Sequence, residues 1–159
     1  MKPRLEYWKV SPGGYKALMS LEAHLRGSGL DHGLLHMIKL RASQMNGCAY
    51  CIDMHWKDAR AAGETEQRLY GLDAWREAPY YSDRERAALQ WTESLTAITA
   101  HNAGHAPHVP DSVYDVVRAQ FSEKELADLT WAIAGINAWN RIAIAFRTEA
   151  GKHKAHSEG

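Results

Sequence analysis

Apolar residues recur along most of the chain at intervals of three and four, the spacing that places side chains on one face of a helix. No segment alternates convincingly between apolar and polar positions at period two, as a half-buried strand would. The pattern therefore predicts one all-α domain. Its clearest stripes are Tyr15, Leu18, Leu21 and Leu25; Ala88, Trp91, Leu95 and Ile98; and Leu126, Leu129, Ile133 and Ile136.

Glycines and capping residues mark the expected helix boundaries. The tripeptide GSG at 27–29 is expected to end the first helix, on which Glu22 points to solvent, and Asp31 can cap the second. Asn46 then offers a cap for a third helix. Gly63 closes that helix, because glycine suits the left-handed position after a helix end.

Two further helix starts carry a capping box, in which a serine and the glutamate three residues later bond reciprocally to the backbone. They begin at Ser82 in SDRE and at Ser122 in SEKE. The segment HNAGHAPHVP at 101–110 predicts a loop, because glycine and two prolines would interrupt a helix. We expect one domain over residues 1–150 and a polar, disordered tail over 151–159.

Composition narrows the classes of function. The 159 residues carry 19 basic and 19 acidic side chains, so nothing favours binding to nucleic acid or to an anionic membrane surface. No apolar stretch approaches the roughly 20 residues that cross a bilayer. The N-terminus, MKPRLEYWKV, lacks the apolar run of a secretory signal. Because the two cysteines are only three apart in a chain without such a signal, we expect a cytoplasmic protein.

Both cysteines stand in NGCAYCIDMH at 46–55, the segment with the strongest chemical signal. On a helix, Cys48 and Cys51 share one face and His55 follows one turn later. A helix N-terminus favours the thiolate, and a histidine can take or deliver a proton near neutrality. One thiol can become a sulfenic acid and the second can condense with it to a disulfide. The segment therefore indicates a dithiol redox enzyme.

Other interpretations of the same residues stay open. The two cysteines can be small buried hydrophobes. Cys48, Cys51, His55 and His36 can also form a Cys₂His₂ zinc set, although structural zinc sites usually take their CxxC from a turn. We nevertheless expect neither a bound metal nor a cofactor beyond the cysteine pair. The loop and tail histidines suggest no site either: His101, His105, His108, His153 and His156.

The segment LLHMIKLRASQMNGCAYCIDMHWKDAR closely resembles the signature of the AhpD-like family, the alkylhydroperoxidase and carboxymuconolactone decarboxylase superfamily. AGETEQRLYGLDAWREAPYYSDRERAALQWTE and FSEKELADLTWAIAGINAWNRIAIAFR resemble the rest of a short member, so the similarity covers roughly residues 3–148. It implies a helical bundle of about six to seven helices that assembles as a homotrimer or homohexamer. It also implies a peroxidase that reduces hydroperoxides and is re-reduced by a lipoylated or thioredoxin-like dithiol protein.

The resemblance maps the active-site cysteines of the family onto Cys48 and Cys51, and its relay histidine onto His55. One position departs: where the family commonly has a glutamate, twelve residues before the first cysteine, this chain has His36. A histidine there can still accept a proton, but it can also carry positive charge and favour a thiolate. Because Cys51 is one turn from His55, we expect it to be the activated thiol, with Cys48 exchanging with the reductant.

Two rival functions remain. One is a non-redox enzyme of the decarboxylase branch acting on a small lactone acid, and the other is a metal-binding protein without catalysis. Six tryptophans, Trp131 and Trp139 among them, suit a subunit interface. Asn137 and Asn140 are polar on an otherwise apolar helix, and we expect them to form helix–helix hydrogen bonds.

Overall fold

The computed structural model describes residues 2–98 and 109–155, and these residues contain no strand. The prediction of an all-α fold is confirmed. Within the described residues, the two short helices Tyr7–Val10 and Glu66–Tyr70 and a 3₁₀ turn bring the number of helices above the six to seven expected. The helices in the described residues are α1 (Tyr7–Val10), α2 (Pro12–Arg26), α3 (His32–Asn46), α4 (Ala49–Ala61), α5 (Glu66–Tyr70), η1 (Gly71–Ala74), α6 (Asp83–Thr96), α7 (Asp111–Arg118) and α8 (Glu123–Phe146).

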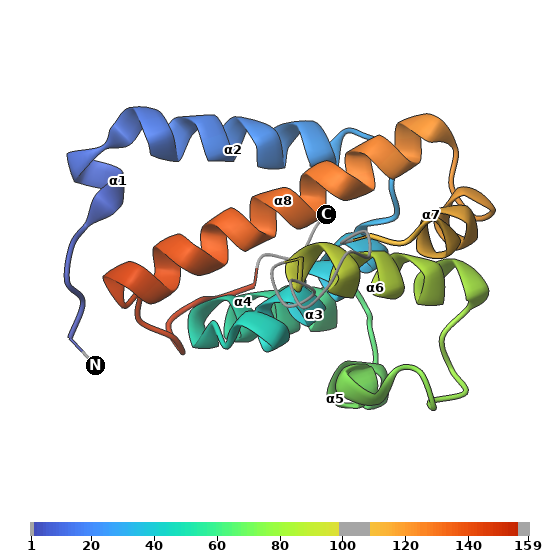
Figure 1. Ribbon diagram of the computed structural model, residues 1–159. Coiled ribbons are helices and arrows are strands. Elements are labelled where there is room, and N and C mark those ends of the chain that lie inside the picture. Colours follow the sequence, from blue (N-terminus) through green and yellow to red (C-terminus); the bar gives the residue numbers. More distant parts are fainter. Residues whose placement is uncertain (1, 99–108, 156–159) are drawn as a thin grey trace.

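Helix α8 runs through the middle of the bundle, with α2 along one side and α3, α4 and α6 on the other (Figure 1). Helix α3 packs against α4, α6 and α8, and most of its side chains from Leu34 to Ser43 are buried. None of the helices in the described part of the chain is long and apolar enough to cross a membrane. The central position of α3 and α8 matters because α8 supplies Asn140 to the cysteine pair and α3 supplies Ser43 and Asn46, the partners of that asparagine.

Most residues of the predicted stripes lie in the apolar core, whereas Tyr15 and Ile98, at the ends of two stripes, are exposed. Leu25 of α2 and Leu129 and Ile133 of α8 are almost completely buried in the largest cluster of this core. A separate small cluster surrounds the two cysteines, with Ala42 of α3 and Ile136 of α8 packed against them. The thiols therefore lie in an apolar layer between three helices.

The start of α4 differs from the expectation. Asn46 does not cap this helix but is the last residue of α3, and its amide donates to Asn137 Oδ1 at 3.0 Å and Asn140 Oδ1 at 2.8 Å. Gly47 adopts the left-handed conformation, with φ of 69°, and turns the chain directly into α4. Cys48 takes the capping position instead.

The other predicted boundaries are confirmed. Asp31 accepts the N–H of Leu34, and Gly63 has a φ of 96° just beyond α4. Both capping boxes, at Ser82 and Ser122, are formed in full. The predicted loop at 101–110 lies almost entirely outside the described residues.

Glu22 does not point to solvent, as expected from the stripe on α2. Its carboxylate accepts a hydrogen bond from Lys39 Nζ at 2.5 Å and another from Trp139 Nε1 at 3.1 Å. The contact joins α2 to α3 and α8. It also neutralises a lysine that is buried close to the histidines described below.

Candidate active site

The two thiols are buried, unbridged and held at the first turn of α4. Each cysteine exposes only 1% of its surface. The backbone N–H of Cys51 donates to Cys48 Sγ at 3.4 Å, so this sulfur satisfies one of the free donors at the helix start. The positive end of the helix dipole adds to the stabilisation of negative charge on Cys48.

The pKa values of the pair move in opposite directions. A hydrogen bond from the Cys51 side chain, with further donors from the backbone and from Asn140, lowers the pKa of Cys48 from 9.0 to about 7. The hydrogen bond to Cys48 raises the pKa of Cys51, and burial raises it further. The lower pKa therefore belongs to Cys48, whereas the sequence spacing led us to expect the activated thiol at Cys51.

Asn140 of α8 joins the cysteine pair to the helix bundle. Its side chain is fully buried, donates to Ser43 Oγ at 3.0 Å and accepts from Asn46. It also hydrogen-bonds both thiols and lowers the pKa of each. The expected helix–helix hydrogen bonds are thus present. The link to the thiols, and the contribution of Ser43, were not predicted, although a buried asparagine on an apolar helix was the available signal.

His55 lies one turn after Cys51 on α4 and is a neutral base. It exposes 7% of its surface, and burial, followed by the charges of Lys39, His36 and His153, lowers its pKa well below the ordinary 6.5. Neither ring nitrogen has a hydrogen-bond partner among the residues that the structure describes. An uncharged imidazole with free lone-pair capacity can accept a proton from a neighbouring thiol.

His36 approaches His55 from α3. The ring centroids are 6.1 Å apart with the planes at 49°, and His36 is half-buried. Donor atoms of His36, His55 and Asp58 all lie within 4.8 Å of one another. Within residues 2–98 and 109–155, this is the group of three or more His, Cys, Asp or Glu donors that comes together, and neither cysteine belongs to it. The alternative Cys₂His₂ set is therefore not assembled.

Asp58 was not predicted as a site residue, and neither was its partner His153. Asp58 Oδ1 lies 2.6 Å from Nε2 of His153, which belongs to the segment that follows α8. The same segment is tied to α4 by Lys57, which donates to the carbonyls of Gly151 and His153. The C-terminal segment as far as residue 155 thus runs beside α4 (Figure 1). The tail sequence carries no pattern that indicates this contact.

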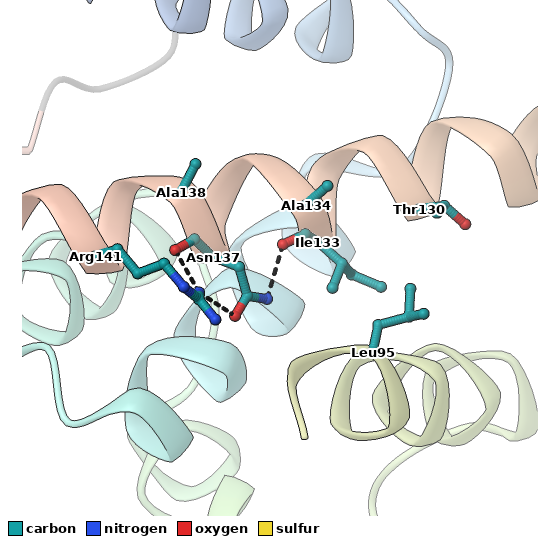
Figure 2. Close-up of a pocket in the computed structure, with 7 residues that line it drawn as sticks. All are labelled: Leu95, Thr130, Ile133, Ala134, Asn137, Ala138 and Arg141. Carbon is teal, nitrogen blue, oxygen red and sulfur yellow. Dashed lines mark hydrogen bonds between the residues drawn. The ribbon is translucent and has the colours of Figure 1, made fainter. Parts of the chain in front are cut away.

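An open groove of about 380 Å³ runs along α8 where it faces α6, and Leu95 and Ile133 form part of its wall (Figure 2). Asn137 lies in the groove, and Arg141 donates to its backbone and side-chain oxygens. The Oδ1 atom of Asn137 also accepts from Asn46, which bonds to Asn140 beside the thiols. The groove is thus connected to the thiol site by a short chain of amides, but neither cysteine lines it.

Comparison with known proteins places the chain in a family. Residues 12–94 match the model of the carboxymuconolactone decarboxylase family. YdfG of Bacillus subtilis (strain 168), itself uncharacterised, is 44% identical over 94% of this chain and 98% of its own length.

Solved structures agree with that placement. ATU0492 of Agrobacterium tumefaciens, a protein of unknown function suggested to be the antioxidant defence protein AhpD, is 44% identical, with a TM-score of 0.86 over 96% of this chain and 100% of its own. A peroxidase-related protein from Ralstonia eutropha JMP134 with an alkylhydroperoxidase AhpD core shares the fold at 19% identity. Its TM-score is 0.75 over 91% of this chain and 74% of its own. The chain belongs to the carboxymuconolactone decarboxylase family, in the AhpD-like superfamily.

Proposed function

We propose that the protein is a dithiol peroxidase that reduces hydroperoxides through Cys48 and Cys51. The observation that carries the proposal is the asymmetry of the pair: a pKa of about 7 for Cys48 beside a protonated Cys51 within hydrogen-bonding reach. A thiolate is the nucleophile in peroxide reduction, and a neighbouring thiol is what converts a sulfenic acid into a disulfide. A pair built only for packing needs no such difference.

The reaction balances with this pair alone. The Cys48 thiolate attacks one peroxide oxygen, the O–O bond breaks, and Cys48 becomes a sulfenic acid while the alkoxide leaves and takes up a proton as the alcohol. The Cys51 sulfur then attacks the sulfur of Cys48, the S–S bond forms, and the oxygen departs as water. Two thiols and one hydroperoxide thus give one disulfide, one alcohol and one water.

His55 is proposed as the proton acceptor in the second step. Cys51 must lose its proton to attack, and its raised pKa prevents spontaneous ionisation near neutrality. The neutral imidazole one turn along α4 is suited to receive that proton. In this assignment Cys48 is the peroxide-reactive sulfur and Cys51 the resolving one, which reverses the hypothesis based on sequence spacing. His36, beside His55, is proposed to pass the proton onward.

Each turnover consumes the dithiol, so an external reductant must restore it. We propose a lipoylated or thioredoxin-like protein, because a second dithiol can reduce the Cys48–Cys51 disulfide by exchange. A homotrimer or homohexamer in the cytoplasm also remains part of the proposal. The exposure of Trp131, at 57% on α8, supports an interface at that helix.

The test is a free-thiol count on the metal-free protein before and after one equivalent of cumene hydroperoxide. Loss of both thiols, with recovery by dihydrolipoamide, supports the peroxidase. Trapping with dimedone then identifies the reactive sulfur, and Cys51→Ser is expected to form a sulfenic acid on Cys48. Two thiols that survive the peroxide exclude the proposal and favour the non-redox decarboxylase alternative. A sulfenic acid that forms on Cys51 in Cys48→Ser, but not on Cys48 in Cys51→Ser, overturns the assignment of the two roles.

A further inference from the structure

We propose that His36, His55 and Asp58 form a binding site for a divalent transition-metal ion of the zinc class, separate from the two thiols. The three side chains come from two packed helices: His36 from α3, and His55 and Asp58 from α4. A spacing of three residues on α4 puts His55 and Asp58 on the same face, toward His36.

The distances fit a site that closes around an ion. The ligand atoms of the three residues lie within 4.8 Å of one another. Zinc bonds of about 2 Å hold ligand atoms roughly 3.4 Å apart in a tetrahedron. Side-chain rotations of His36 and Asp58, both half-buried, can supply the difference of up to about 1.4 Å without moving either helix.

The state of His55 provides an independent indication. This side chain is more than nine-tenths buried, and neither of its ring nitrogens is hydrogen-bonded within the described part of the chain. Burial of polar atoms without partners is unfavourable, and buried polar groups in native proteins are normally satisfied. A metal ion bonded to one ring nitrogen would satisfy that nitrogen of His55, for which residues 2–98 and 109–155 supply no donor or acceptor.

The donor set selects the type of ion. Two imidazoles and one carboxylate suit zinc and other divalent transition metals, whereas calcium and magnesium prefer oxygen ligands. Three protein ligands also leave a coordination position open for water or an anion. Lys39, whose charge acts on His55, is paired with Glu22 at 2.5 Å, so that charge is largely offset.

His153 gives the carboxylate a fixed orientation. Its Nε2 lies 2.6 Å from Asp58 Oδ1, which leaves Oδ2 of the same carboxylate to face the ion. Hydrogen bonds of this kind to ligating carboxylates are the usual outer support of metal sites. The C-terminal segment would therefore contribute to metal affinity without supplying a ligand.

Metal binding and peroxide turnover would compete for one residue. This consequence rests on the proposed function: an ion on His55 removes the acceptor for the Cys51 proton and slows disulfide formation. The binding itself does not depend on that function, so the two can fail separately. The thiols would remain free in the metal-bound protein.

The experiment is a titration of the reduced protein with Co²⁺, followed by its visible absorption, with Zn²⁺ as the competing ion. The Cys48→Ser/Cys51→Ser variant is titrated in parallel. Both proteins are expected to bind one equivalent, without the near-ultraviolet charge-transfer band that thiolate ligation produces. Asp58→Asn and His36→Phe are expected to weaken binding by about 100-fold or more, beyond the effect of losing an outer-shell group.

Two further variants control for misfolding. His36→Glu keeps a ligand atom and is expected to retain binding within about tenfold. Asp128→Asn removes the carboxylate of another aspartate–histidine pair, whose partner His24 lies 3.0 Å away, and should leave Co²⁺ binding unchanged. The proposal is overturned if the wild type shows no saturable binding, if Asp58→Asn and His36→Phe bind as wild type, or if the double serine variant loses the ion.

Discussion

The backbone N–H of Cys51 and the sulfur of Cys48 lie 3.4 Å apart at the start of α4, so the first cysteine of the motif caps the helix that carries the second. Serine, threonine, aspartate and asparagine usually take this position, because a compact oxygen accepts the free N–H groups. A sulfur in the same place accepts more weakly as a thiol than as a thiolate. The cap therefore favours ionisation of Cys48, so the start of α4 contributes directly to the reactivity of this thiol.

Removing the Cys51 side chain should raise the pKa of Cys48. The hydrogen bond from that side chain is the largest cause of the shift from 9.0 to about 7. In Cys51→Ala the pH midpoint for alkylation of Cys48 by iodoacetamide, followed by mass spectrometry, is expected to move toward 9. Cys51→Ser keeps an O–H donor and should give a midpoint between the two. An unchanged midpoint in Cys51→Ala would mean that the backbone cap alone sets the ionisation.

Features that depend on a few neighbouring residues were predictable from the sequence. The capping boxes at Ser82 and Ser122 and the helix end at Gly63 depend on contacts three or four residues apart, and all three are present. The error at Asn46 arises because neighbouring residues in the sequence do not reveal partners on a distant helix. Its side chain is a good cap in isolation, but two partners on α8 bind it in the fold.

Contacts between distant parts of the chain were not predictable. Asp58 and His153 are 95 residues apart, and neither carries a pattern that points to the other. Glu22 occupies a polar position between stripe residues, yet hydrogen bonds from Lys39 and Trp139 hold its carboxylate between the helices. The motif supplied the identity of Cys48, Cys51 and His55. The direction of their pKa shifts depends on the hydrogen bond between the two thiols and on burial in the assembled fold, which the sequence spacing does not give.

A left-handed residue at position 47 is needed to bring Cys48 to its capping position. Gly47 has a φ of 69°, which any residue with a Cβ adopts at a cost, so Gly47→Ala should lower the free energy of unfolding by about 1 kcal/mol. A Cβ there would meet nothing within 4 Å, so the loss reflects the backbone and not a clash. Urea denaturation measures it. Gly13→Ala, on α2 and equally unobstructed, should instead stabilise by up to about 1 kcal/mol.

Asn140 should matter both for stability and for the thiols. Asn140→Ala leaves Ser43 and Asn46 without their buried partner and is expected to lower the free energy of unfolding by about 2 kcal/mol. It should also raise the pKa of Cys48, because the amide is one of the donors that lower it. Urea denaturation and pH-dependent alkylation measure the two effects.

Asn137 provides the matched control for that variant. It lies one turn before Asn140 on α8, is half-buried and also accepts from Asn46, but no hydrogen bond from it contributes to the pKa of Cys48. Asn137→Ala should therefore be destabilising by less and leave the alkylation midpoint near 7. Equal midpoints in the two variants would show that the amide of Asn140 acts only on packing.

Burial of His55 should make the protein less stable in mild acid. Its pKa is lowered well below 6.5 in the folded state, so between that folded value and 6.5 the unfolded chain binds a proton that the native protein does not. Stability then falls as the pH drops below 6.5. For a single group the loss between about pH 7.5 and 5.5 is about 1 kcal/mol. Urea denaturation at the two pH values measures it.

Carboxylates with lowered pKa values, such as Asp53 and Asp128, lose their contribution to stability only as the pH falls below their ordinary value of 3.8, outside this window. A variant without the imidazole isolates the contribution of His55. His55→Gln removes the titrating group and keeps a polar side chain. The free energy of unfolding that this variant loses between the two pH values should be smaller than the loss of the wild type by about 1 kcal/mol, whatever the absolute stability of the variant. Equal losses in both proteins would mean that His55 is protonated in the folded state, and a protonated imidazole could not accept the proton of Cys51.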